Sequence, residues 1–65
     1  MIRTVIRLKN DMVMVFDEDG EQLPKYHGSY AEVRESILKD APPDVVFAHW
    51  TGQKTKPQTI ARTDW

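Results

Sequence analysis

The chain contains no cysteine among its 65 residues. Without thiols it can form no disulfide bridge and no thiolate-ligated zinc site. A chain of about this length buries only about 60% of the surface that its unfolded form exposes. Small domains without such cross-links often gain further burial from oligomerisation or from a partner. The sequence therefore predicts one small globular domain over residues 1–65, with a core close to the minimum for independent folding.

Long apolar runs are also absent. No stretch approaches the roughly 20 apolar residues that a membrane-spanning helix needs. Arg3 and Arg7 interrupt residues 1–7, which therefore lack the apolar segment of a signal peptide. We expect a cytoplasmic protein without a membrane segment, and the absence of cysteine agrees with this expectation.

Motifs for catalysis, phosphate binding or metal binding are missing from the sequence. His27 and His49 have no further ligands at zinc-site spacing, and the acidic residues 17–21 do not match a calcium-binding loop. Ser29 has no nucleophile elbow around it and is better explained as a helix cap. We therefore expect no enzymatic activity, cofactor, metal site or small-molecule substrate. No segment carries the signature of a family.

The composition is that of a globular protein, with 40% hydrophobic and 29% charged residues and a net charge of −1. The charges are unevenly distributed, because residues 1–10 contain basic but no acidic side chains and residues 11–24 contain acidic but no basic ones. The small net charge gives no general attraction to nucleic acid or to an anionic membrane.

The clearest element is a helix that begins after Ser29 and ends near residues 40–41, before Pro42. Ser29 and Glu32 have the spacing of a capping box, in which each side chain accepts a hydrogen bond from the other residue's amide. Apolar residues recur at helical spacing and form one stripe: Tyr30, Val33, Ile37, Leu38 and Ala41.

Two strands precede this helix, at residues 2–9 and 12–17, and a two-residue turn at Asn10-Asp11 is expected to join them. This turn pairs Arg7 with Met14 and Val5 with Phe16. Because side chains alternate along a strand, the pairing predicts two faces. One face holds Ile2, Ile6, Leu8, Val13 and Val15, and the other holds Arg3, Val5, Arg7, Lys9, Met12, Met14 and Phe16.

The remaining segments are less regular. A loose acidic turn at residues 17–21 is expected to lead into a short third strand at residues 22–26, where Pro24 restricts it to an edge. Residues 45–50 form an apolar run typical of a buried strand. Residues 51–57 are expected to form a loop, and residues 58–65 a last short strand or an extended arm.

These elements predict an α+β fold with a small antiparallel sheet of three to five strands, in the order β-β-(β)-α-β-(β), and one helix across one face. Segment 51–65 is expected to be an arm or an edge strand of this domain. The predicted core consists of Ile2, Ile6, Leu8, Val13, Val15, Tyr30, Val33, Ile37, Leu38, Val46 and Phe47.

One helix can cover only one face of such a sheet, so the other face needs a cover. The predicted interface residues on that face are Arg3, Arg7, Lys9, Met12, Met14 and Phe16. Methionine, aromatic residues and arginine are typical of protein interfaces. We expect a non-enzymatic interaction module, a homo-oligomer or an accessory subunit, with this face in contact with its partner. Two alternatives stay open, which are RNA or single-stranded DNA binding through the same basic and aromatic residues, and coverage by residues 51–65.

Overall fold

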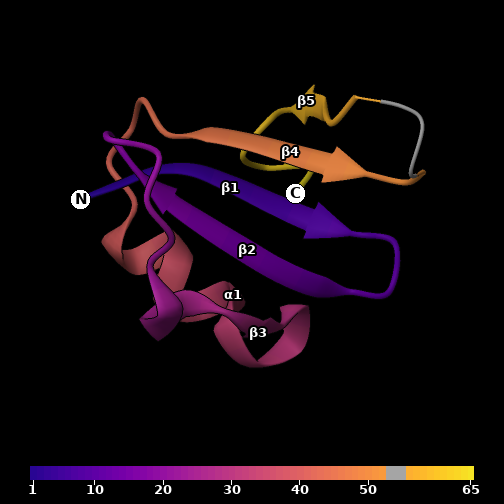
Figure 1. The fold of residues 1–65 in the computed structure, drawn as a ribbon, viewed down its shortest axis with the longest axis horizontal. Coiled ribbons are helices and arrows are strands. Elements are labelled where there is room, and N and C mark those ends of the chain that lie inside the picture. Colours follow the sequence, from indigo (N-terminus) through magenta and orange to yellow (C-terminus); the bar gives the residue numbers. More distant parts are fainter. Residues whose placement is uncertain (53–55) are drawn as a thin grey trace.

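A five-stranded sheet with one helix against one of its faces forms the fold (Figure 1). The computed structural model describes residues 1–52 and 56–65. Its elements are β1 (Ile2–Leu8), β2 (Met12–Asp17), the 3-10 helix η1 (Pro24–Tyr26), β3 (Gly28–Ser29), α1 (Tyr30–Asp40), β4 (Val46–Trp50) and β5 (Gln58–Ile60). The strands lie in the order β3-β2-β1-β4-β5. The predicted α+β class is therefore confirmed, and β5 is an edge strand.

The sheet is mixed, whereas the sequence predicts an antiparallel one. Strand β1 lies in the middle and pairs with β2 in the antiparallel and with β4 in the parallel direction. Parallel neighbours need a long connection between them. Here α1 belongs to that connection, because it carries the chain from the β2–β3 side of the sheet to the far side of β1.

The β1–β2 hairpin differs from the predicted one by a single residue. Its loop has three residues, 9–11, and Asp11 takes a left-handed backbone conformation with φ 62°. The Asp11 amide donates to the Leu8 carbonyl over 3.0 Å, and the Met12 amide donates to Asn10 Oδ1 over 3.1 Å. As a result Arg7 faces Val13 instead of Met14. A slip of one residue moves a strand's side chains to the other face, so Val5 and Arg7 exchange faces with Ile6 and Leu8. Ile2 stays in the predicted core, because the register shifts between Ile2 and Thr4.

Helix α1 starts and ends where the sequence predicts, with Ser29 before it and Ala41 after it. The predicted capping box is wrong, because the Ser29 side chain makes no capping hydrogen bond. Main-chain pairing holds the helix start instead: Ser29 pairs with Met12 in the sheet, and the Tyr30 amide donates to the Asp11 carbonyl over 2.7 Å.

The segment before α1 forms less than the predicted strand at 22–26, because its pairing with β2 is limited to one isolated antiparallel bridge, Phe16–Gln22, and the Leu23 amide, which donates to the Val15 carbonyl over 2.9 Å. Pro24 lies in the first turn of η1, and the strand that pairs with β2 is β3, further along the chain. Proline suits a helical first turn because it lacks the amide hydrogen that a strand would use. The loose acidic turn is confirmed. It is organised by Asp17, whose Oδ1 accepts the amides of Asp19 and Glu21, each over 2.9 Å.

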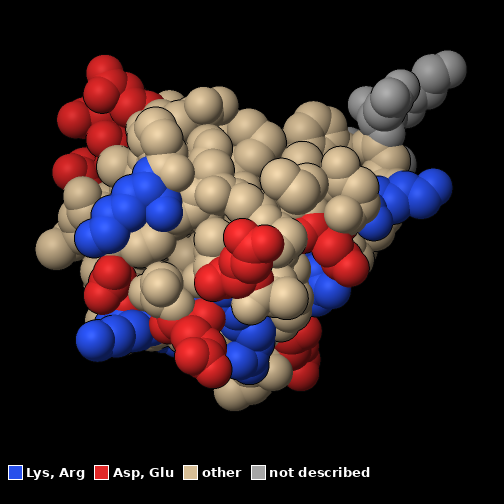
Figure 2. All heavy atoms as spheres, turned by 90° about the horizontal axis from the view of Figure 1, so that it is seen from below, with Lys and Arg blue, Asp and Glu red and all other residues tan. Residues whose placement is uncertain are grey.

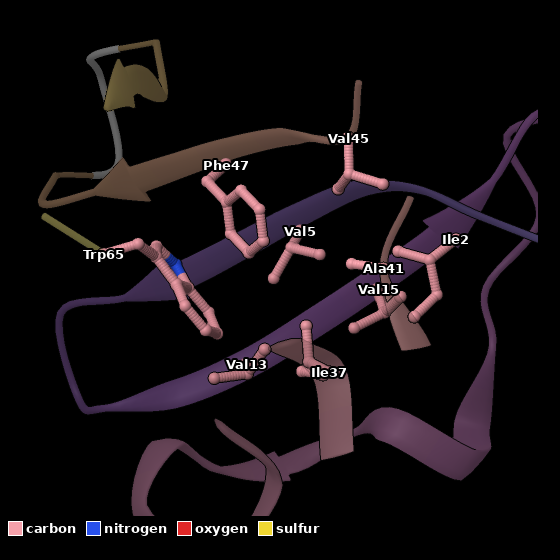
Figure 3. Packing of buried hydrophobic residues seen from close by; sticks show 9 residues of the cluster. All are labelled: Ile2, Val5, Val13, Val15, Ile37, Ala41, Val45, Phe47 and Trp65. Carbon is pink, nitrogen blue, oxygen red and sulfur yellow. The ribbon is translucent and has the colours of Figure 1, made fainter. Parts of the chain in front are cut away.

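The core lies between α1 and one face of the sheet (Figure 3). The buried residues of its cluster are Ile2, Val5, Val13, Val15, Ile37, Ala41, Val45, Phe47 and Trp65. Val5, Ala41, Val45 and Trp65 are absent from the predicted core. Tyr30, Val33 and Leu38 pack against the cluster while partly buried, as expected for the helix stripe.

The C-terminal segment completes this core. Trp65 is 4% exposed, and its ring lies 5.1 Å from that of Tyr30 and 4.9 Å from that of Phe47, measured between centroids. Tyr30 Oη also donates to the Trp65 backbone oxygen. Arg62 donates to the carbonyls of Leu38 (2.6 Å), Ala41 (3.1 Å) and Pro42 (3.2 Å), which belong to the end of α1 and the turn after it. Residues 56–65 therefore close the helix side of the sheet, whereas residues 53–55 of the predicted arm lie outside the described residues.

Candidate interaction surface

The sheet face opposite α1 is an apolar surface, which we call the open face. Val5 and Val15 face each other across β1 and β2 and point into the core, so the alternate residues of these strands point the other way. In β4, Phe47 lies beside Val5 and points into the core, which turns its neighbours outward. The apolar residues of the open face are Ile6, Leu8, Met12, Met14, Phe16, Val46, Ala48 and Trp50.

The burial data distinguish this face from the core. Ala48 is only 4% exposed, yet it does not belong to the core cluster. Ile6 and Phe16 are half-buried and likewise are not among the side chains that pack against that cluster. Neighbours on the open face itself must therefore shield them, and these side chains form a second apolar layer.

The open face has no second helix or strand over it in the part of the chain that the structure describes (Figure 1). Met12 is 41% and Val46 39% exposed, and both are among the most exposed large apolar residues of the chain. A sheet face of this kind leaves apolar area in contact with water, and such patches on folded chains commonly mark binding sites.

The structure does not bring together all six residues that the sequence predicts for this face. Met12, Met14 and Phe16 lie together on the open face through the alternation of β2. Arg3 and Arg7 each form a salt bridge with an acidic side chain. Arg3 Nη1 lies 2.8 Å from Asp44 Oδ2.

Arg7 points to the helix side of the sheet. Its guanidinium carbon lies 3.7 Å from the centroid of the Tyr30 ring, and its Nη2 lies 2.7 Å from Asp11 Oδ1. Lys9, the third basic residue, is exposed in the loop beyond the end of β1. The basic side chains therefore surround or avoid the apolar residues instead of alternating with them.

Five apolar residues of the open face, Ala48 among them, escape the sequence prediction. Ile6, Leu8 and Val46 are assigned there to the core, and Ala48 and Trp50 have no assigned face. The pair Asn10-Asp11 is the sequence signal that could have given the correct faces of β1. Asp tolerates the left-handed conformation, which occurs at the end of a three-residue hairpin loop as well as in a two-residue turn.

Figure 2 views the molecule from the β2 and α1 side and shows how the charges are distributed. Acidic and basic side chains cover its lower part, where α1 lies. The middle of the upper part, toward the open face, is a broad area of uncharged residues, with acidic side chains gathered at its left end. The contrast agrees with the assignment of residues by strand register, in which Arg7 and Asp17 do not share this face with Ile6 and Met14, while Arg3 lies in the register shift between Ile2 and Thr4.

A hollow lies at the hairpin end of this surface, with a volume of about 680 Å³. It is lined by Leu8, Lys9, Asn10, Trp50, Thr51 and Gly52. Trp50 Nε1 is buried without a hydrogen-bond partner, so the indole contributes mainly apolar surface here. The hollow therefore extends the open face and does not form a separate polar site.

The two histidines do not form a site together. His27 Nε2 lies 3.2 Å from the Val15 carbonyl oxygen, whereas His49 lies on β4 beside Arg7. Within residues 1–52 and 56–65, no group of three histidine or carboxylate side chains is arranged to hold a metal ion. In the same ranges, no helix is long and apolar enough to cross a membrane.

Among the residues that the structure describes, Tyr26 has a pKa clearly displaced from its ordinary value. The Tyr26 hydroxyl donates to Asp40 Oδ2 over 2.6 Å. This hydrogen bond, together with partial burial and the negative charge of Asp40, raises the pKa of Tyr26 above its ordinary value of 10.0. The pair joins η1 to the end of α1 and lies on the helix side, so its role is structural.

No family model, curated protein or solved structure matches this chain. The candidate site therefore depends on its own geometry alone.

Proposed function

We propose that this chain is a non-enzymatic protein-interaction module, a homo-oligomer or an accessory subunit, whose open face contacts the partner. The observation that supports the proposal is the separation of two apolar layers by one sheet. The first layer, around Ile37 and Phe47, is sealed by α1 and Trp65. The second, around Ile6 and Met14, has no such cover among the described elements.

The chemistry of the open face suits a protein surface. Methionine and aromatic side chains are enriched at protein interfaces, and methionine adapts its shape to its contacts. Met12, Met14, Phe16 and Trp50 supply both kinds. The half-exposed Met12 and Val46 would lose their remaining contact with water on binding, and burial of apolar surface contributes about 25 cal/mol per Å².

Nucleic acid is the weaker candidate for this surface. An RNA-binding sheet combines aromatic platforms with basic groups that contact phosphates. Here Arg3 and Arg7 are already paired with Asp44 and Asp11, and Lys9 lies at the end of the face. The proposal therefore assigns the face to a protein partner.

Site-specific crosslinking tests the proposal. A photo-crosslinking amino acid in place of Met14 should form adducts with protein when living cells are irradiated. When a cell lysate is irradiated instead, the adducts should form equally at low and at high salt. The matched control carries the same group in place of Ser36, which is exposed on α1. Adducts from position 14 that exceed those from position 36 support the proposal. Equal yields, or adducts that ribonuclease or deoxyribonuclease removes, would overturn it.

A further inference from the structure

The two ends of the open face carry opposite charge. At the end where β2 finishes, the turn 17–21 contains Asp17, Glu18, Asp19 and Glu21 and no basic side chain. Within residues 1–52 and 56–65, the one cation that pairs with this turn is the Met1 amino group, 3.6 Å from Glu18 Oε2. The turn therefore retains a net negative charge.

The hairpin end is positive. Lys9 is exposed there and forms no salt bridge within the described part of the chain. Arg7 and Asp11 neutralise each other at 2.7 Å. Lys56, also exposed, precedes β5 at the same end, because His49 near the end of β4 pairs with Gln58 at the start of β5.

This polarity favours one mode of self-association. Two identical faces can stack about a two-fold axis that lies between them, parallel to both sheets and perpendicular to the strands. Each strand then lies over its counterpart with its ends exchanged. The acidic turn of one copy then approaches Lys9 of the other, twice per dimer. An axis parallel to the strands would instead bring both acidic turns to the same end of the dimer, where each would lie near the neutral Arg3–Asp44 pair of the other copy and far from its Lys9.

The shapes of the apolar side chains agree with the exchanged ends. Leu8, Met12 and Trp50 lie at the hairpin end of the face, and Phe16 and Val46 lie at the opposite end. Exchange of the ends places the exposed Val46 of one copy over the hollow beside Leu8 and Trp50 of the other. The small Ala48 lies at mid-face, where it permits the roughly 10 Å separation of packed sheets.

The area is sufficient for a stable pair. A standard interface removes about 600–1,000 Å² from each partner. The chain exposes 4628 Å² and measures 29 × 23 × 23 Å, so one complete face is of this order.

We infer that the occupant of the open face is a second copy of this chain, stacked face to face with its strands antiparallel to those of the first. The inference rests on the proposed function and adds the partner's identity and orientation. The juxtaposition of the acidic turn 17–21 with Lys9 across the two-fold axis fixes the orientation.

Sedimentation over a range of protein concentrations tests the inference. The unmodified chain should form a dimer, and Phe16→Lys should give a folded monomer, because Phe16 does not pack against the core. Lys9→Glu and Asp19→Lys should each raise the dimer dissociation constant by roughly 2- to 20-fold, as two exposed ion pairs are lost. Glu35→Lys makes the same charge change as Asp19→Lys on the exposed surface of α1 and should leave the constant unchanged.

Combination of the two charge reversals tests the orientation. The double variant Lys9→Glu/Asp19→Lys should recover the original dissociation constant. An equimolar mixture of the two single variants should recover it as well, because residues 9 and 19 then carry opposite charges at both ends of the mixed dimer. Failure of both recoveries would overturn the antiparallel arrangement.

A chain that stays monomeric at all concentrations overturns the inference. If crosslinks from position 14 then reach a different protein, the proposed function survives without it. If neither dimer nor adduct forms, both are wrong.

Discussion

The guanidinium group of Arg7 lies 3.7 Å from the centroid of the Tyr30 ring, so the middle strand of the sheet is joined to the first residue of α1. The same ring takes part in the core through Trp65, and its hydroxyl accepts a hydrogen bond from Arg34 Nε over 3.0 Å. Tyr30 thus connects β1, α1 and the C-terminal segment at one point.

Replacement of Arg7 should weaken this connection. Cation–π contacts contribute about 0.5–2 kcal/mol depending on their exposure, and the Arg7 side chain is 27% exposed. We expect Arg7→Ala to lower the free energy of unfolding by about this amount in urea denaturation. Arg7→Lys should retain part of it. Equal stability of the alanine variant and the unmodified chain would show that the contact contributes nothing.

The two apolar layers should respond differently to truncation. Ile37 is fully buried, so Ile37→Ala should cost about 2–5 kcal/mol, which is a large fraction of such a domain's stability. Val46, assigned to the core from sequence, is 39% exposed, and Val46→Ala should change the stability of the monomer by less than about 0.5 kcal/mol. Thermal unfolding of both variants, made in the Phe16→Lys background to exclude association, measures the difference. Similar costs at both positions would contradict the assignment of faces.

Ser29→Ala should have little effect. A side chain that caps a helix contributes about 1 kcal/mol, but Ser29 makes no such bond. We expect a change within about 0.5 kcal/mol in chemical denaturation. A loss of 1 kcal/mol or more would restore the capping box that the sequence suggests.

Trp65 should be essential for the packed core. Trp65→Ala removes a ring that is 4% exposed and contacts both Tyr30 and Phe47, which should cost about 3–5 kcal/mol. Near-ultraviolet circular dichroism, sensitive to fixed aromatic packing, should lose intensity. Trp65→Phe provides the control, since it retains most of the apolar contact. A stable, fully packed alanine variant would refute the role of residues 61–65 in closing the core.

The Tyr26–Asp40 pair gives the fold a dependence on alkaline pH. The pKa of Tyr26 is raised because its hydroxyl donates to Asp40, so the folded state favours the neutral phenol. The stabilisation is complete below pH 10, the ordinary pKa, and is lost as the pH rises through the raised value. Absorbance titration should show that Asp40→Asn shifts the Tyr26 transition downward, with Tyr26→Phe identifying the signal. An unshifted transition would contradict the assigned cause.

Local sequence signals predict the helix and the strands because these depend on neighbouring residues. The 3.6-residue spacing that ends at Ala41 and the β-branched run of β2 need no distant partner to be recognised. The hairpin register depends on a smaller difference, between a two-residue and a three-residue loop around Asp11. That difference of one residue moves Ile6 from the core to the open face.

Long-range contacts account for the rest. Nothing local to Trp65 indicates that it fills a space between Tyr30 and Phe47, and nothing local to β4 indicates that it lies parallel to β1. The candidate site was therefore predicted in part. Met12, Met14 and Phe16 share a face through the alternation of a single strand, whereas Arg3 and Arg7 find partners that only the fold brings near.

The position of Trp65 has a consequence for synthesis. A ribosome makes the central strand β1 first, and the side chain that closes the space between Tyr30 and Phe47 only 57 residues after β1 ends at Leu8. Until that residue has left the exit tunnel, the nascent sheet presents apolar surface on both faces. The core around Phe47 therefore stays incomplete until the chain has been synthesised as far as Trp65.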